Sequence, residues 1–362
     1  MRFRIIGSIT LSLILFGTSQ SLAADEVETS ADSRLVLVKT ISGSITPKSV
    51  RSSKFGIVSA HNMMYQHSVT IYNSETFALI KTIPDSVQLS QFGYKSFSGK
   101  YRGAPVEGAY SPDGEYLYVT NYSMYGKGFN KEGHDTCSPS SGFDRSFVYR
   151  IDLESYEIDA IYQVGVVPKV VEVTPDNKYI LVTNWCSYDL SIISVAQQKV
   201  VKTLKIGAYP RGITVSNDGK IAYVAQMGGA TIHRIDLTNL TTRTIYIGSN
   251  PRAIVLSPNN KILYATLNRS GKVVAFDLVK SRQIASVTTG KAARSLAISS
   301  DGTALFVVNF ASGTVSKVRA ADLKILQTLK VCRQPIGVTY DESTDRTWVA
   351  CYLGQIKIFD NQ

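Results

Sequence analysis

The chain has 362 residues, of which 44% are hydrophobic and 19% are charged. A globular fold with a sizeable core is therefore expected, and an intrinsically disordered chain is excluded. The formal net charge of +11 favours anionic partners, but charge alone does not indicate nucleic acid.

The first 23 residues have the pattern of an export signal peptide. Arg2 and Arg4 form a basic start, residues 5–16 are apolar, and Ser21-Leu22-Ala23 supplies small residues for cleavage. An uncleaved anchor is the alternative, although twelve apolar residues are short for a membrane span. We expect an exported protein, periplasmic or extracellular, with residues 24–33 as a flexible acidic leader and no membrane span in the mature chain.

A turn followed by a strand recurs along the rest of the chain. The turn is written SPDG in its first copy. Its five clear copies begin at Ser111, Thr174, Ser216, Ser257 and Ser299, and a degenerate sixth copy begins at Tyr340. The spacings are 63, 42, 41, 42 and 41 residues. Pro, Asp and Gly suit the successive positions of a tight turn. Because the segments between turns are rich in β-formers, a period near 40 predicts the blades of a β-propeller.

Each unit is expected to contain four strands, a to d. Seven copies of strand a are present, starting near Pro47, Pro105, Pro168, Pro210, Pro251, Ala293 and Pro335. The last unit lacks a strand d, and residues 35–41 match the strand d of other units. We therefore predict an all-β fold, a single seven-bladed propeller over residues 34–362, in which the N-terminal strand pairs with the C-terminal blade.

The strand after the first turn also carries a family resemblance. Residues Tyr118-Val119-Thr120-Asn121 resemble the motif of the YVTN-repeat β-propeller family, and the resemblance covers roughly residues 35–361. Later copies of the motif drift from it and end at Asn184, Gln226, Asn309 and Cys351. The resemblance implies the fold. It implies function only broadly, because such propellers are similar to exported proteins, surface-layer components and sugar-lactone hydrolases alike.

Two long connections break the period. Residues 84–104 join the first two units, and residues 122–145 join strands b and c of the second unit. Both are expected on the propeller face opposite the a–b turns, and loops of this length are uncommon unless they are functional or disordered. They mix aromatic with basic residues, namely Phe92, Tyr94, Phe97, Tyr101, Tyr122, Tyr125 and Phe129 with Lys95, Lys100, Arg102, Lys127 and Lys131.

Aromatic rings interleaved with cations suit stacking on sugars and docking onto acidic surfaces. The candidate ligand-binding residues in the two insertions are Tyr94, Tyr101, Tyr122, Tyr125 and Lys127. The alternative is that the aromatic residues only pack the insertions onto the ring.

A second candidate site comes from one repeat position. The second residue of strand a is basic in five units: Lys48, Lys169, Arg211, Arg252 and Arg294. Five such charges around the channel mouth would reinforce each other within a Debye length of roughly 8 Å and recruit carboxylate, phosphate or sulfate. The alternative follows from strand parity. Arg211 is in register with Ile213 and Val215, so it can lie between blades and bond carbonyls or an acidic neighbour.

The four cysteines fit an oxidising compartment. Cys137 in the second insertion and Cys186 after strand b of the next unit are expected on one face. Cys332 precedes strand a of the last unit, and Cys351 ends the partner strand. We predict the disulfides Cys137–Cys186 and Cys332–Cys351, with free structural thiols as the alternative.

Metal binding and catalysis have little support in the sequence. The histidines His61, His67, His134 and His233 lack the spacing of a zinc site, and we expect no metal and no cofactor. Glu107 and Glu172 lie in strand a of adjacent units and could do acid–base work or hold Ca²⁺. The preferred interpretation is that they neutralise Lys169 or Arg211.

The sequence thus favours an exported, non-enzymatic binding scaffold. Its expected partner is an anionic glycan, an envelope component or a protein surface, recognised by the face that bears the insertions. Nucleic acid is not expected as the natural ligand of an exported protein. The alternative is a lactonase-like hydrolase that acts on a small acidic sugar derivative in the channel, with Glu107 and Glu172 as its working pair.

Overall fold

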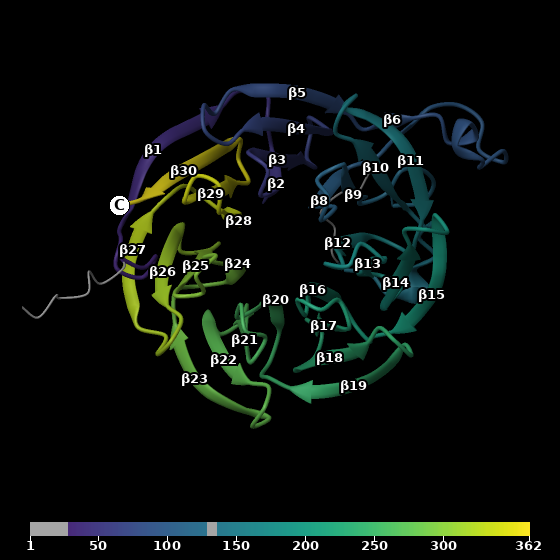
Figure 1. Ribbon diagram of the computed structural model, residues 1–362. Coiled ribbons are helices and arrows are strands. Elements are labelled where there is room, and N and C mark those ends of the chain that lie inside the picture. Colours follow the sequence, from purple (N-terminus) through teal and green to yellow (C-terminus); the bar gives the residue numbers. More distant parts are fainter. Residues whose placement is uncertain (1–27, 129–135) are drawn as a thin grey trace, which may run out of the picture.

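The computed structural model describes residues 28–128 and 136–362 of the chain. Seven four-stranded antiparallel sheets stand around a common axis (Figure 1). In six of them the strands follow chain order from the axis to the rim, and the seventh includes the first strand of the chain. The predicted all-β, seven-bladed fold is therefore confirmed.

Blades 1 to 4 follow one another along the chain, each with strands a to d from the axis outward. Blade 1 contains β2 (Pro47–Ser52), β3 (Ile57–Asn62), β4 (Ser68–Asn73) and β5 (Leu79–Pro84). Blade 2 contains β8 (Pro105–Tyr110), β9 (Tyr116–Asn121), β10 (Phe147–Asp152) and β11 (Glu157–Gln163). Blade 3 contains β12 (Pro168–Val173), β13 (Tyr179–Asn184), β14 (Asp189–Ser194) and β15 (Lys199–Lys205). Blade 4 contains β16 (Pro210–Val215), β17 (Ile221–Gln226), β18 (Thr231–Asp236) and β19 (Thr241–Tyr246).

Blades 5 to 7 complete the ring. Blade 5 contains β20 (Pro251–Leu256), β21 (Ile262–Leu267), β22 (Lys272–Asp277) and β23 (Arg282–Thr288). Blade 6 contains β24 (Ala293–Ile298), β25 (Ala304–Asn309), β26 (Thr314–Arg319) and β27 (Ile325–Lys330). Blade 7 contains β28 (Pro335–Asp341), β29 (Arg346–Cys351), β30 (Gln355–Asn361) and, as its outermost strand, β1 (Leu35–Ser42).

The ring is closed by the two ends of the chain, as predicted. β1 lies along β30 on the outside of blade 7, with Leu35 opposite Asn361 and Ser42 opposite Gln355 (Figure 1). This pairing supplies the strand that the C-terminal segment lacks. It also covers the edge of β30, which would otherwise present unpaired amide and carbonyl groups.

The segment just before β1 differs from the flexible leader expected from its composition. Among its described residues, 28–33, the amide of Ser30 donates to the carboxylate of Asp301 at 2.8 Å. The ammonium of the buried Lys317 donates to the carbonyl of Ser33 at 2.7 Å and to its hydroxyl at 2.8 Å. These hydrogen bonds therefore hold residues 30–33 against blade 6. The rest of the leader and the signal peptide, residues 1–27, lie outside the described residues.

The hydrophobic core is divided into layers between neighbouring blades. Tyr118 and Val148 of blade 2, for example, pack against Val171 and Val182 of blade 3. Equivalent clusters join every other pair of neighbours around the ring. Strand b is covered on both faces, and all six residues of β25 are buried. Each blade thus needs both neighbours to bury its apolar surface, and the axis is left open.

The repeated Thr of the motif joins one blade to the next. Every strand a shifts register against strand b after its first residue, which marks a β-bulge. The hydroxyl of Thr120 accepts a hydrogen bond from the amide of Glu107 at 3.2 Å and donates to the carbonyl of Lys169, in the next blade, at 3.1 Å. Thr183 links blades 3 and 4 in the same way.

The Asn that follows this Thr holds the corner between strands b and c. The side-chain amide of Asn184 donates to Asp189 at 2.7 Å and to Ser191 at 2.9 Å, both on strand c. Asn309 donates to the hydroxyls of Thr314 and Ser316, each at 3.1 Å. The repeat motif is therefore explained by structure, because Thr connects blades and Asn shapes a turn.

Blade 1 has His61 where blades 2, 3 and 5 have this Thr. Its Nδ1 lies 2.7 Å from the hydroxyl of Ser49, which donates to the carbonyl of Val106 in blade 2 at 2.9 Å. Its Nε2 occupies the space beside Gly108, where a Cβ would lie only 2.3 Å away. Burial lowers the pKa of His61 from 6.5 to about 3, so the folded protein holds this imidazole neutral.

We expect His61 to contribute to acid denaturation. Its folded pKa is lower than its unfolded pKa, so stability falls by about 1.4 kcal/mol per pH unit as the pH drops from 6.5 towards 3. His61→Thr, which restores the repeat residue, should flatten the loss of melting temperature between pH 6.5 and pH 4. An unchanged acid slope in this variant would contradict the assignment.

Ring closure predicts a second stability effect. A chain that starts at residue 43 loses β1 and exposes the edge of β30. A chain that starts at residue 28 keeps β1, and the edge of β30 stays covered. We expect the shorter chain to melt at least about 5 °C lower and to aggregate sooner. Differential scanning calorimetry with light scattering measures both effects, and equal melting temperatures would show that β1 is not needed for closure.

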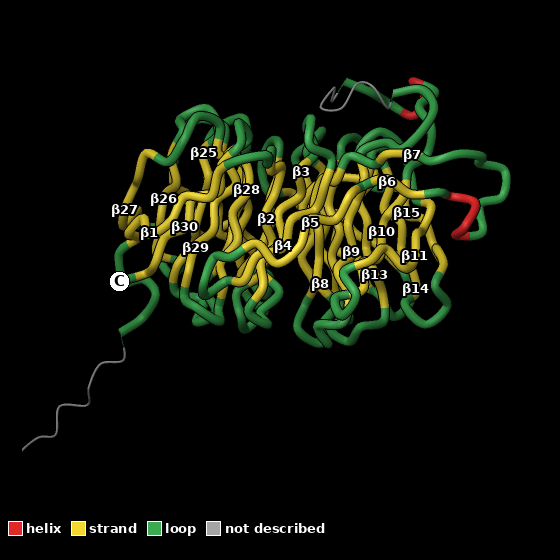
Figure 2. Tube along the Cα trace, turned by 90° about the horizontal axis from the view of Figure 1, so that it is seen from above, coloured by secondary structure: helices red, strands yellow, loops and turns green. Residues whose placement is uncertain are grey.

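The two insertions lie together on one side of the ring, at blade 2 (Figure 2). The first contains the short ribbon of β6 (Ser86–Val87) and β7 (Tyr101–Arg102) and the 3-10 helix η1 (Leu89–Phe92). The described part of the second contains the 3-10 helix η3 (Pro139–Ser141). The rings of Phe97 and Tyr125 are 4.6 Å apart, so the two insertions touch each other.

Candidate functional site

The insertions form one packed unit on the face opposite the a–b turns. Tyr94 and Phe97 of the first insertion meet Phe147 at the start of β10 edge to face, with ring centroids 4.9 and 6.2 Å apart. Tyr101 packs against Phe97 and Tyr125 at 6.1 and 5.9 Å. These rings are half-buried against one another, so much of their aromatic surface is used in packing the unit onto blade 2.

The predicted disulfides are present and anchor this face. Cys137 of the second insertion is bonded to Cys186 of blade 3, with Cα atoms 5.4 Å apart. The hydroxyl of Tyr188 adds a hydrogen bond to the carbonyl of Cys137 at 3.1 Å. The second disulfide, Cys332–Cys351, joins the approach to β28 with the end of β29 in the closing blade. The second insertion is therefore fixed to a blade other than its own.

The cations of the insertion unit point outward. Besides Arg145, whose Nε donates to the carbonyl of Val164, four described cations of the unit are exposed: Lys95, Lys100, Arg102 and Lys127. Tyr122, also a candidate from the sequence, is almost fully buried, with the ammonium of Lys169 4.6 Å from its ring centroid. The unit thus shows solvent mainly its charges. Phe129 and Lys131 lie outside the described residues.

The five basic residues at the second position of strand a lie inside the molecule, whereas the anion-binding hypothesis from the sequence placed them around the mouth of the channel. Lys48, Arg211, Arg252 and Arg294 line the central channel, and Lys169 is buried beside Tyr122 and Trp185. Burial, together with the positive charges of Arg211 and Arg252, holds the pKa of Lys48 well below its usual value. The structure therefore brings several of these charges close together.

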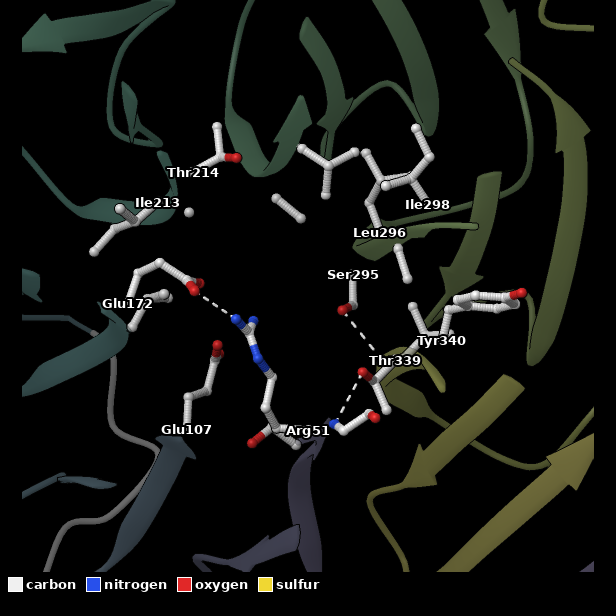
Figure 3. A pocket seen from close by; sticks show the side chains of 18 of the residues that line it. Arg51, Glu107, Glu172, Ile213, Thr214, Ser295, Leu296, Ile298, Thr339 and Tyr340 are labelled. Atoms are coloured by element: carbon white, nitrogen blue, oxygen red, sulfur yellow. Dashed lines mark hydrogen bonds and ion pairs between the residues drawn. The ribbon is translucent and has the colours of Figure 1, made fainter. Parts of the chain in front are cut away.

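The channel along the propeller axis has a volume of about 720 Å³. Two ion pairs cross its interior. A guanidinium nitrogen of Arg211 in blade 4 lies 3.0 Å from the carboxylate of Glu107 in blade 2, and Arg51 in blade 1 lies 2.5 Å from Glu172 in blade 3. Figure 3 shows Arg51 reaching from β2 towards Glu172, with Glu107 beside it. Each pair links blades that are not neighbours.

The two candidate acids thus face the same channel, each held by an arginine. Burial raises the pKa of Glu172, the charge of Arg51 lowers it, and Glu107 raises it again. The predicted neutralisation of Glu107 by Arg211 is present. The partner of Glu172 is Arg51, which sequence reasoning missed. The available signal was that Arg51 occupies the same position in its strand a as Glu172 does in strand a of blade 3.

Histidines do not come together as metal ligands in the part of the chain that the structure describes. Over residues 28–128 and 136–362, no group of three or more His, Cys, Asp or Glu residues is placed to hold a metal ion. His61 is buried between blades 1 and 2, and Nδ1 of His67 lies 3.1 Å from the carboxylate of Asp85. His134 lies outside these ranges. Within the same ranges, no helix is long and apolar enough to cross a bilayer.

Comparison with known proteins agrees with this architecture. A family model described as "YNCE-like beta-propeller" matches residues 140–220. The chain is a seven-bladed β-propeller. A second model, "Cytochrome D1 heme domain", matches residues 252–350 of this propeller. Neither model is the YVTN-repeat family, so that narrower assignment stays a prediction.

Among solved structures, the propeller is similar to Kuenenia stuttgartiensis hydrazine synthase, with a TM-score of 0.66 and 17% sequence identity. The match covers 86% of this chain and 95% of the other. An identity this low shows a common fold and carries no statement about activity. No curated protein matches the sequence significantly.

The ion pair across the channel yields a measurable coupling. In a double-mutant cycle with Glu107→Gln and Arg211→Met, we expect a coupling of roughly 1–3 kcal/mol in unfolding free energy, because Arg211 is nearly buried. The matched pair Lys54–Glu342, at 3.3 Å but far more exposed, should couple by less than about 0.5 kcal/mol. Urea unfolding measures both. Equal couplings would show that burial does not strengthen the channel pair.

Proposed function

We propose that this protein is an exported binding scaffold whose ligand-binding surface is the insertion unit on blade 2. The observation that supports this most directly is that the aromatic and the basic side chains of the unit have different surroundings. The aromatic side chains pack inward against Phe147, while Lys95, Lys100, Arg102 and Lys127 are exposed. A disulfide and the ring beneath hold the surface in place, so little ordering is needed on binding.

The proposed export rests on two features. The N-terminal sequence has the order of a signal peptide, with a basic start, an apolar stretch and small residues at positions 21–23. All four cysteines form disulfides, which persist in oxidising compartments and are rare in the cytosol. The proposal therefore places the protein in the periplasm or outside the cell.

The ligand chemistry follows from the exposed charges. Four cations on one small, anchored surface attract carboxylate, sulfate or phosphate groups, and the attraction weakens as salt is added. An anionic glycan of the cell envelope offers such groups at regular intervals, and so it is the partner we propose. An acidic protein surface is the other partner that this chemistry admits.

Binding is better supported than hydrolysis in the channel. General acid–base work needs a carboxylate that can exchange protons with a substrate. Glu107 and Glu172 are each engaged by an arginine, at 3.0 and 2.5 Å. These contacts occupy both carboxylates and fit a bracing role.

The name of the D1 model raises the question of a haem in the channel. Proteins hold haem iron through His, Cys, Met or Tyr side chains. The described residues that line the channel include no His, Cys or Met. Of its two tyrosines, Tyr340 donates its hydroxyl to Asp345 at 2.7 Å, and burial raises the pKa of Tyr110, which disfavours the phenolate that would bind iron. The lining does not fit a haem, and we derive no step through one.

The binding surface can be tested with defined polymers. Heparin and polygalacturonate serve as anionic glycans, dextran as the neutral control and polyglutamate as a model of an acidic protein surface. We expect micromolar or tighter binding of an anionic glycan to the mature protein, measured by biolayer interferometry. The triple variant Lys95→Ala, Lys100→Ala, Lys127→Ala should weaken it by about tenfold or more.

The matched control removes three exposed lysines from the rim of blade 3, as Lys199→Ala, Lys202→Ala, Lys205→Ala. This variant has the same net charge as the first. Equal loss of binding in both variants would show that total charge, and not the insertion unit, attracts the polymer. Stronger binding of polyglutamate than of either glycan would replace the glycan with a protein partner.

A further inference from the structure

Arg51 is the least enclosed of the charged residues that cross the channel. Its side chain is 39% exposed, whereas that of Arg211 is 6% exposed. One terminal nitrogen is bound to Glu172, and a guanidinium has five N–H donors in all. Figure 3 shows the side chain of Arg51 extending from β2 into the channel towards Glu172. Arg51 is therefore placed to bind more than Glu172.

The channel as a whole favours an anion. Its lining contains six basic residues, namely Lys48, Arg51, Lys54, Arg211, Arg252 and Arg294, against three acidic residues, Glu107, Glu172 and Glu342. The formal charge of this lining is +3, from six positive and three negative groups. Low-dielectric walls concentrate such a field inside a cavity.

The opposite wall has a different character. Blades 5 and 6 contribute Arg252 and Arg294 near the start of strand a. Beyond these two cations, the strands of blades 5 to 7 line the channel with small apolar and hydroxyl side chains, among them Ala253, Val255, Ala297, Ser295 and Thr339. Figure 3 shows Ser295 and Thr339 across the channel from Glu107 and Glu172. A ligand that spans the channel therefore meets charge on one side and mainly apolar surface on the other. The volume of about 720 Å³ is that of sites for small organic molecules.

The channel is lined as far as the a–b turns, away from the insertion unit. Its lining there includes the turn residues Pro112, Pro175 and Pro258, together with Phe55, which is 58% exposed. The exposed ion pair of Lys54 and Glu342 lies at the same end, so a molecule entering here meets apolar and charged side chains before it reaches Arg51. This route does not involve the surface proposed above for polymers.

We propose that the channel binds a small organic carboxylate with an apolar body, whose carboxylate is bound by Arg51. A guanidinium matches a carboxylate with two parallel N–H···O bonds. Glu172 accepts a hydrogen bond from one terminal nitrogen of Arg51, which restricts the direction of the remaining donors. The apolar body lies against Ala253, Val255 and Ala297. This inference goes beyond the proposed scaffold function, because it concerns another face and another class of ligand.

Three probes with one apolar body and different head groups test the proposal. They are 4-phenylbutyrate, 4-phenylbutanol and 4-phenylbutylamine, titrated into the mature protein by isothermal titration calorimetry. We expect 4-phenylbutyrate to bind with a 1:1 stoichiometry and at least about tenfold more tightly than the alcohol, and the amine not to bind. Equal affinities of acid and alcohol, or no binding of the acid, would overturn the proposal.

Variants locate the site. Arg51→Gln alone leaves Glu172 without its partner and can unfold the protein, so the test uses Arg51→Gln with Glu172→Gln, checked for an unchanged circular dichroism spectrum. This variant should lose about tenfold or more in affinity for 4-phenylbutyrate. Ala297→Leu, which fills the apolar wall without changing any charge, should weaken binding as well. Undiminished binding to the Arg51→Gln, Glu172→Gln protein would refute the assignment.

Two controls separate this site from the polymer surface. Arg243→Gln on the rim strand β19 should bind 4-phenylbutyrate as the wild type does. The Lys95→Ala, Lys100→Ala, Lys127→Ala protein should also bind it normally while losing the anionic glycan. If this triple variant loses 4-phenylbutyrate as well, the carboxylate binds at the insertion unit and the channel proposal is wrong.

Discussion

The fold depends on one constraint, which is that no blade can bury its own apolar faces. Each four-stranded sheet has two such faces, and each is covered by a neighbouring blade, as Tyr118 and Val148 are covered by Val171 and Val182. An open row of blades would leave the two end faces in water, so the row has to close into a ring. The pairing of β1 with β30 completes that ring from the two ends of one chain. A closed ring is rigid, and a rigid ring is a suitable base for a binding surface.

The same constraint explains why charged side chains can occupy the centre of the ring. Since the apolar layers lie between blades, the residues of strand a that point to the axis need not be apolar. They include Arg51, Glu107, Glu172 and Arg211, which pair across the open channel. The bulge after the first residue of every strand a adds a second site of variation, because it redirects side chains such as Lys48 without disturbing the ladder beyond it.

Charge and aromatic surface are separated in this protein. In the insertion unit the rings of Tyr94, Phe97 and Tyr125 contact one another and Phe147, and the lysines face solvent. Packing uses the ring faces that sequence reasoning assigned to ligand stacking. In the channel the arrangement is reversed, since charged groups are enclosed and share the lining with small apolar side chains such as Ala253 and Ala297. The two surfaces therefore suit different ligands, a polymer on one face and a small molecule along the axis.

The sequence by itself determined the architecture, because local signals repeat with the period of a blade. The turns from Ser111 onward, the seven copies of strand a and the unpaired final unit were enough to predict seven blades and their closure. The positions of the four cysteines on these units then predicted both disulfides. Only the tertiary structure decided which side chains meet across the ring. Arg51 and Glu172 are 121 residues apart in the sequence and belong to blades 1 and 3, which are not neighbours in the ring. No repeat signal reports such a contact, because it depends on the curvature of the closed ring and on the direction of individual side chains.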